Sequence, residues 1–191
     1  MPPPRAPYGV VRVLGADEQH DVEVDVLRWI RLAEAVLAAE RVLVEAELSI
    51  LFVDEPTIAD LNHRFLDGDG PTDVLAFPID DDAIVGRSPD QGGRGPGTPT
   101  EPSDVPLVIG DVVVCPAVAA RQAVEGERAV DDELALLVVH GLLHLLGYDH
   151  AEEAEGTRMR RREAELLAAH YRGEASEAPL AASGPDAEPG R

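Results

Sequence analysis

The sequence has almost no cysteine. Cys115 is the only one among 191 residues, which excludes a disulfide framework and a cysteine-rich zinc module. It ends a strand-like run before Pro116, and we interpret it as a small buried hydrophobe. A single cysteine is consistent with a reducing compartment.

Long hydrophobic runs are also missing. No apolar stretch reaches the length of a membrane span, and residues 1–5 lack the apolar region of a signal peptide. We therefore expect a cytoplasmic protein without a membrane partner. The length and the 45% hydrophobic content predict a single domain over residues 1–170 and a disordered tail over 171–191.

Lysine is absent, and the chain has 16 arginines and 37 acidic residues, which gives a net charge of −21. Taken alone, this charge argues against a nucleic-acid partner, because phosphates attract cations. The one dense basic cluster is Arg158 with Arg160 to Arg162. Glutamates alternate with it, which favours a solvated helix face over a phosphate-binding surface. Part of the acidity lies in segments without a core pattern, so the local charge matters more than the total.

Three of the six histidines lie close together, as His140, His144 and His150. A helix over 131–146 would place the first two one turn apart on one face, with Cβ atoms about 5–6 Å apart. Gly147 can take the left-handed conformation that ends a helix, so the chain can return the third histidine to the same point. The spacing predicts one zinc ion with an open fourth position, as in catalytic sites. The alternative is that these are core histidines whose hydrogen bonds are satisfied within the protein. That interpretation suits a lone histidine better than a group of three.

The spacing also matches the metzincin peptidase signature H-E-x-x-H-x-x-G-x-x-H, except that Gly141 replaces the glutamate. In those peptidases the glutamate is the general base that activates water. Glycine cannot transfer a proton, so the pattern predicts the metal geometry without the peptidase chemistry. The base is then unassigned: Asp149 is nearest in sequence, and Asp111 is the next candidate.

Apolar periodicity predicts the remaining elements. Strands are expected at 8–14, 46–53, 72–78 and 107–115, with Gly15 ending the first. Helices are expected at about 26–40, 57–65, 116–124, 131–146 and 152–170, with caps from Asp25, from Asp54 or Thr57, and from the acidic residues 131–133. These acidic residues are also expected to give the helix at 131–146 a negative first turn. Trp29 is expected to pack on the apolar stripe of the first helix. Residues 80–106 lack periodicity and are predicted to form an exposed loop, at least partly disordered.

Five segments of the chain form a recognisable set: Leu61-Asn62, 71–78 (PTDVLAFP), 110–113 (GDVV), 133–135 (ELA) and 140–150 (HGLLHLLGYDH). Together they resemble the YbeY family of bacterial ribosomal RNA maturation factors. The resemblance runs from about Val10 to Leu167. It implies an α+β fold, with a small mixed sheet and helices around a central buried histidine-bearing helix. It also implies one zinc ion bound by His140, His144 and His150, and metal-dependent endoribonuclease activity. The implied partners are ribosomal RNA, at the 3′ end of the small-subunit species, and ribosomal particles in quality control; DNA is not expected.

One position departs from the family. Many members have an arginine implicated in activity where this chain has Leu66. Arg64 lies two residues earlier, and it can replace that arginine only if the helix has already ended, because residues two apart on a helix face different directions. The candidate catalytic residues are therefore His140, Arg64, Asp149 and Asp111, with Arg64 stabilising charge on the phosphate.

Three functions are compatible with these residues. The leading hypothesis is hydrolysis of single-stranded RNA, in which zinc activates water or polarises a phosphoryl oxygen; attack by the 2′-hydroxyl, leaving a cyclic phosphate, stays open. The second is a ribosome-assembly factor whose zinc is mainly structural, which the acidic charge and Leu66 favour. The third is a hydrolase of small molecules or peptides, and Gly141 argues against peptides. The sequence does not indicate an oligomeric state.

Overall fold

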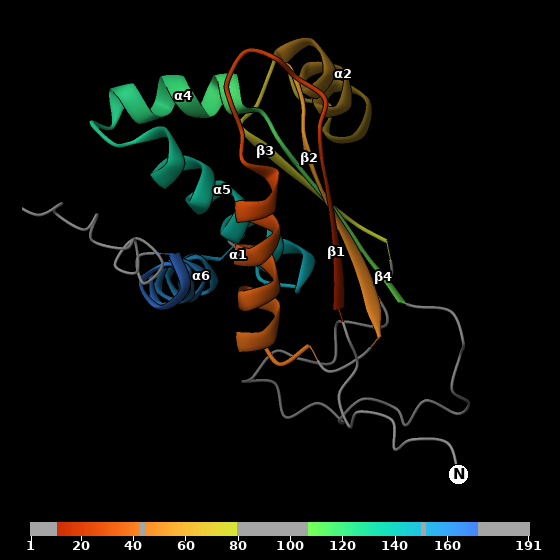
Figure 1. The fold of residues 1–191 in the computed structure, drawn as a ribbon, viewed down its shortest axis with the longest axis vertical. Helices are drawn as coiled ribbons and strands as arrows, with labels where there is room; N and C mark the ends of the chain where they lie inside the picture. Colours follow the sequence, from red (N-terminus) through yellow and green to blue (C-terminus); the bar gives the residue numbers. More distant parts are fainter. Residues whose placement is uncertain (1–10, 43–44, 80–106, 150–151, 172–191) are drawn as a thin grey trace, which may run out of the picture.

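A mixed four-stranded sheet forms the centre of the computed structural model, which describes residues 11–42, 45–79, 107–149 and 152–171 (Figure 1). The strands are β1 (Val11–Asp17), β2 (Ala46–Phe52), β3 (Val74–Pro78) and β4 (Leu107–Val114). Their order is β1-β2-β4-β3. β1, β2 and β4 are parallel, and β3 is antiparallel to β4. The predicted α+β class with a small mixed sheet is confirmed.

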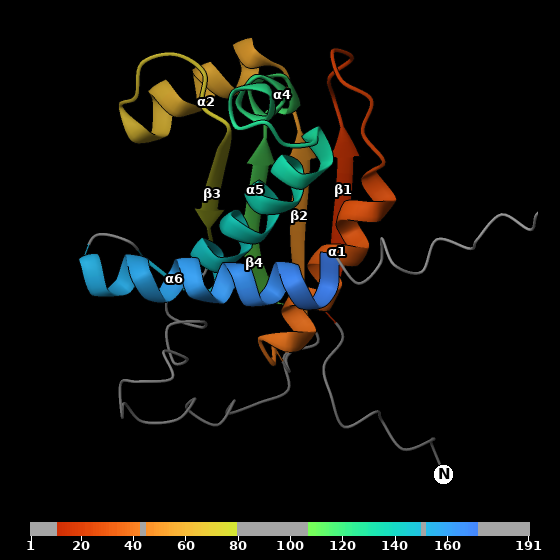
Figure 2. The ribbon, with the colours of Figure 1, turned by 90° about the vertical axis from the view of Figure 1, so that its left-hand side faces the viewer.

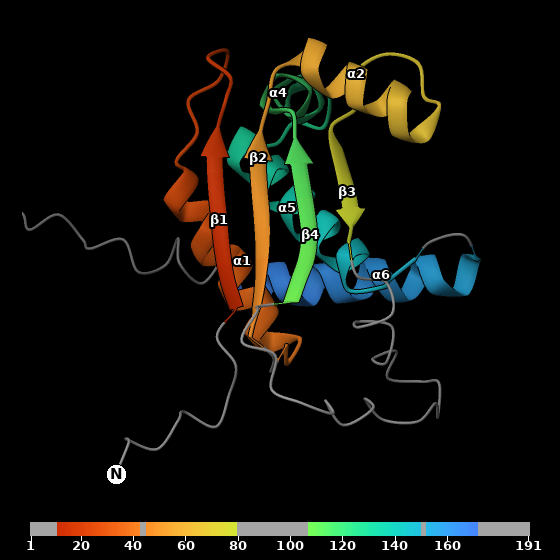
Figure 3. The ribbon, with the colours of Figure 1, turned by 90° about the vertical axis from the view of Figure 1, so that its right-hand side faces the viewer.

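The helices are α1 (Val26–Ala39), α2 (Glu55–Leu66), α4 (Pro116–Glu125), α5 (Val130–Leu145) and α6 (Glu153–Leu166), followed by a π-helical turn at Leu167–Tyr171. α1 and α5 cover one face of the sheet, and α6 crosses beside the end of α5 (Figure 2). α2 lies on the opposite face, near the ends of β2 and β4 (Figure 3). None of the helices in the described residues has the length and apolar content needed to cross a membrane.

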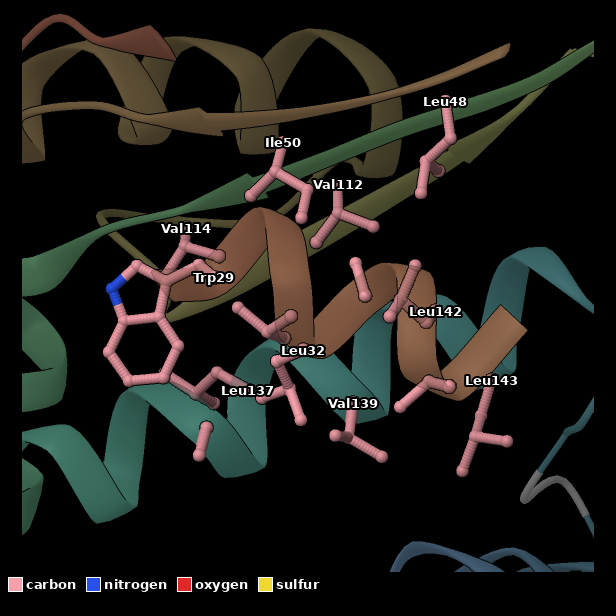
Figure 4. Close-up of a cluster of buried hydrophobic side chains, with 14 of the residues drawn as sticks. Trp29, Leu32, Leu48, Ile50, Val112, Val114, Leu137, Val139, Leu142 and Leu143 are labelled. Atoms are coloured by element: carbon pink, nitrogen blue, oxygen red, sulfur yellow. The ribbon is translucent and has the colours of Figure 1, made fainter. Parts of the chain in front are cut away.

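The main core lies between the sheet and the helices α1 and α5 (Figure 4). Trp29 and Leu32 from α1 meet Leu142 and its neighbours from α5 in one cluster of buried side chains. The strands contribute Leu48, Ile50, Val112 and Val114. Ten residues of α5 are buried, because the sheet, α1, α4 and α6 all pack against it. A helix enclosed in this way holds its remaining polar side chains in fixed positions.

β1 continues through Asp17, so the prediction that Gly15 ends the strand was wrong. The parallel register with β2 is unbroken as far as Phe52. A Cβ atom at residue 15 would lie 2.6 Å from Val26 Cγ1 and 2.9 Å from Ile30 Cδ1. The glycine is therefore needed where α1 crosses close to the strand, and it does not mark a chain reversal.

The helix caps agree with the sequence pattern in α2 and differ in α5. The Asp54 carboxylate accepts a hydrogen bond from the backbone N–H of Thr57 at 2.9 Å, as predicted. The N-cap of α5 is Ala129, which makes no side-chain cap bond. The predicted acidic cap of this helix was wrong. The predicted negative first turn is confirmed, because Asp131, Asp132 and Glu133 lie there and interact favourably with the helix dipole.

Two predictions of buried side chains are confirmed. Cys115 has no exposed surface, and burial raises the pKa of its thiol. Trp29 is 1% exposed and stacks on Tyr171 with ring centroids 6.2 Å apart, which excludes a role in stacking on a nucleobase. Tyr171 extends the described fold one residue past the predicted domain end. The predicted loop at 80–106 and the tail from 172 onward lie outside the described residues.

Candidate metal centre

α5 ends at Leu145, two residues before the glycine that the sequence pattern selected. Gly147 has a φ of +84°, the left-handed conformation that glycine adopts without a Cβ penalty. The N–H of Gly147 donates to the carbonyl of His144, and the N–H of Tyr148 donates to the carbonyl of Leu143, both at 3.0 Å. These two bonds form a Schellman motif. The chain therefore turns sharply just after the second histidine of the motif.

The two histidines of α5 point their Nε2 atoms at one another. The distance between Nε2 of His140 and Nε2 of His144 is 3.1 Å, and the ring planes make an angle of 78°. Two nitrogens bound to one tetrahedral zinc at about 2.0–2.1 Å would lie about 3.3 Å apart. Two lone pairs at this distance repel unless a proton or a cation lies between them. The pair therefore fits a shared metal ion.

A carboxylate from α6 lies behind the first imidazole. Oε2 of Glu163 is 3.3 Å from Nδ1 of His140, and the Glu163 side chain is only 12% exposed. A carboxylate only accepts hydrogen bonds, so this contact places the proton of neutral His140 on Nδ1. In this tautomer Nε2 carries a lone pair that can accept a hydrogen bond or bind a metal ion. Histidines that bind metals in proteins commonly have such a partner, which fixes the ring and the tautomer.

Gly141 is required by the packing of α5 on the sheet. A Cβ atom at this position would lie 2.6 Å from Cγ1 of Val112, 3.3 Å from its Cγ2 and 3.4 Å from Cγ2 of Val74. Val112 is completely buried and its β-branched side chain is stiff. Position 141 therefore faces β4 and β3, and it has no room for the glutamate of the peptidase signature.

Tyr148 connects the segment after Gly147 to the end of α1. Its hydroxyl donates a hydrogen bond to Oε2 of Glu40 at 3.0 Å. Burial, with the nearby charge of Glu40, raises the pKa of this phenol. The phenol therefore stays protonated and remains a donor.

The third predicted ligand, His150, lies outside the described residues. Within the part of the chain that the structure describes, no group of three histidine, cysteine, aspartate or glutamate side chains is placed to hold a metal ion. The structure thus brings together His140 and His144, and the three-histidine set stays a prediction. Asp149, the nearer candidate base, is exposed in the segment that follows Gly147.

The structure does not bring Asp111 to the histidines. Val112 faces α5, as its approach to Gly141 shows. Neighbouring residues of a strand point to opposite faces of the sheet. Asp111, which is in register with Ser49 and Phe77, therefore points away from the histidine helix.

Arg64 lies on a continuous helix. α2 extends through Leu66 and ends at Asp67, which has a φ of +52°. The condition under which Arg64 would replace the family arginine at position 66 is therefore not met. The Arg64 guanidinium instead forms an ion pair with Asp60 at 3.1 Å, one turn earlier, and its side chain is 60% exposed. A catalytic role for Arg64 stays a prediction.

The sequence pattern missed Glu163. It lies four residues after Met159 and three before Leu166, both of which are buried on the inner face of α6. A carboxylate within an apolar helical stripe needs a partner, because burial without one is costly. The position of Glu163 between two buried apolar residues could have indicated its role. It was missed because many charged residues surround it in the sequence.

Replacing Glu163 by alanine is expected to lower zinc affinity by about 10- to 100-fold, the usual cost of losing the partner behind a metal-binding histidine. Competition with a chelator measures this affinity. Glu153→Ala is the matched control, since Glu153 is exposed in the first turn of the same helix. Equal affinities in the two variants would contradict a role for Glu163 in orienting His140.

Comparisons with known proteins agree with this architecture. Residues 15–171 match the family model described as Endoribonuclease YbeY. A protein of that name from Salinispora tropica is 48% identical over 142 residues, which cover 71% of this chain and 85% of that protein. One from Acidothermus cellulolyticus is 49% identical over 148 residues, which cover 78% and 85%.

A solved structure has the same fold. The solution structure of TM1509 from Thermotoga maritima matches with a TM-score of 0.51 and 23% identity, covering 91% of this chain and 99% of that chain. The family match extends from β1 to the end of the last helix and includes the histidine motif. The chain therefore belongs to the endoribonuclease YbeY family.

Proposed function

We propose that this chain is a zinc-dependent endoribonuclease that cleaves single-stranded RNA. Its proposed role is processing of the 3′ end of small-subunit ribosomal RNA and quality control of ribosomes. The name shared by its relatives supports the endoribonuclease activity. The observation that carries the metal dependence is the pair of Nε2 atoms 3.1 Å apart, with a carboxylate fixing one of the two rings.

The proposed zinc ligands are His140, His144 and His150, in a metzincin-like arrangement on and just after α5. A zinc ion held by three histidines supplies Lewis acidity, which activates water or polarises a phosphoryl oxygen. Rigid packing of α5 supports this role, because ligands on a buried helix keep their geometry through a reaction.

The chain's own residues have distinct tasks in this proposal. Glu163 keeps the proton of His140 on Nδ1, so that Nε2 stays available. Gly141 allows α5 to approach β4 and transfers no proton. Asp149 is the proposed general base, because Asp111 points to the other face of the sheet.

The charge of the chain bears on how the substrate arrives. A net charge of −21 opposes tight binding to free RNA, because few phosphate contacts are available to offset the repulsion. We therefore propose that ribosomal particles present the RNA to the site. Action on these particles would place the protein in the cytoplasm.

Cleavage of ribosomal RNA fragments tests this function. The purified protein is expected to cut a single-stranded fragment, to leave the same sequence uncut in a duplex, to lose activity after chelation and to regain it with added zinc. Model ester and peptide substrates serve as controls and are expected to stay intact. Cleavage that survives complete removal of metal would contradict the proposal.

A second function is favoured by one observation. The family arginine is absent, since position 66 is leucine with 61% of its surface exposed, and Arg64 is paired with Asp60. A ribosome-assembly factor with a mainly structural zinc would tolerate this loss. Stoichiometric zinc and ribosome binding, together with no metal-dependent cleavage, would identify that function instead.

A further inference from the structure

Among the described residues, two nearly buried carboxylates contact the histidine motif: one contacts a histidine and the other a tyrosine. Glu163 contacts His140. Glu40, the C-cap residue of α1, is equally buried, with a side chain 12% exposed. Burying a carboxylate is costly unless it is paired and hydrogen-bonded, so the partners of Glu40 indicate its role.

Both oxygens of Glu40 are used. Oε1 accepts a hydrogen bond from Nε of Arg162 at 2.6 Å, and Oε2 accepts one from the hydroxyl of Tyr148 at 3.0 Å. Arg162 also forms an ion pair with Glu165, with 3.0 Å between Nη1 and Oε2. The carboxylate thus joins α1, α6 and the segment after α5.

We propose that Glu40, held in place by Arg162, is a positioning residue for the proposed metal centre, because it anchors Tyr148 and so fixes the segment that leads to His150. This inference rests on the proposed function. It assigns a metal-related task to three side chains outside the set of proposed ligands. Arg162 and its neighbour Glu163 then support the centre from one turn of α6, the first through Glu40 and Tyr148 and the second through His140.

The turn after α5 does not by itself fix the direction of the segment that follows it. Gly147 makes no close packing contact, since a Cβ atom there would have nothing within 4 Å. The backbone bond from Tyr148 N–H to the carbonyl of Leu143 fixes where the turn begins. The bond from the Tyr148 hydroxyl to Glu40 is a second anchor on the same residue. Two anchors determine the direction in which the chain leaves the helix, which reduces the ordering cost of binding a metal there.

A purely structural role would tie α1 to α6 without affecting the metal. Tyr148→Phe separates the two roles, since it removes one hydroxyl and leaves the contact between Glu40 and Arg162. The variant is expected to bind zinc about tenfold more weakly in chelator competition, at the low end of the effect of groups behind a ligand. The melting temperature of its metal-free form is expected to fall by about as much as that of Tyr171→Phe, which also removes a phenol hydroxyl bonded to a carboxylate.

The remaining variants test the link through Glu40. Glu40→Ala should weaken zinc binding at least as much as Tyr148→Phe, and the double variant no more than Glu40→Ala alone, because both remove the same contact. Tyr171→Phe is the control. It removes the hydroxyl of another buried tyrosine, which bonds to Asp132, and it is expected to leave zinc affinity unchanged.

Wild-type zinc affinity in Tyr148→Phe would overturn this inference while leaving the proposed function intact. Additive losses in the double variant would also overturn it. A wild-type chain that takes up no zinc would overturn the proposed function and this inference together.

Discussion

His144→Ala is expected to abolish zinc binding and RNA cleavage without unfolding the chain. The Nε2 atom of this residue lies 3.1 Å from its counterpart in His140, so its loss removes half of the paired site. Removing a ligand should weaken zinc binding by more than about 100-fold, the upper limit for removing a group behind a ligand. Elemental analysis and cleavage of single-stranded ribosomal RNA measure the two losses.

The fold is expected to persist in this variant because α5 does not depend on the metal. Ten buried residues hold the helix, and alanine is a better helix former than histidine. The free energy of unfolding of the metal-free protein should therefore change by less than about 1 kcal/mol. His63→Ala is the matched control, since His63 is exposed near the end of α2. Full zinc content in His144→Ala would contradict the site.

Gly141→Glu, which restores the peptidase sequence, is expected to unfold most of the protein. The new Cβ would meet Val112 Cγ1 at 2.6 Å, and overpacking of this kind costs about 1–3 kcal/mol. The carboxylate would also be buried against the sheet without a partner, at a further cost of several kcal/mol. The sum is comparable to the total stability of a domain, about 5–15 kcal/mol. Urea denaturation and solubility measure the outcome.

A smaller pair of substitutions isolates the packing contribution. Gly141→Ala gains about 1 kcal/mol of helix propensity and loses about 1–3 kcal/mol to overpacking. In a Val112→Ala background the clash disappears, so the same change should become stabilising. Equal effects of Gly141→Ala in the two backgrounds would show that Val112 does not explain this glycine.

The parts of the fold that could be predicted are those determined by local chemistry. The predicted end of α5 differs from the observed one by a single residue, because Gly147 can take a conformation that other residues avoid. Asp54 caps α2 because its side chain reaches the N–H of Thr57. The pairing of His140 and His144 follows from the helical repeat alone.

The parts that could not be predicted depend on contacts between distant segments. Glu40 contacts Tyr148 across 108 positions of sequence, and His140 contacts Glu163 across 23. The local sequence indicates that Glu163 needs a partner, but it does not indicate which residue that partner is. Gly15 has the local signal of a strand end. Its actual reason, the close approach of α1, exists only in the folded chain.

The placement of the candidate base Asp111 also depends on contacts between distant segments. Asp111 qualified by residue type, and its placement away from the histidines follows from which face of β4 meets α5. A strand sequence fixes the alternation of its side chains but not which face meets a given helix. Asp149 is the first candidate by its nearness in sequence, and the arrangement of the sheet and α5 leaves that order unchanged.

The zinc content of the tag-free protein tests the central claim most directly. Elemental analysis is expected to find about one zinc ion per chain, as three-histidine sites bind one ion. The triple variant of His140, His144 and His150 to alanine is expected to contain none. A wild-type protein without zinc, or a triple variant that retains it, would contradict the metal centre on which the proposed function rests.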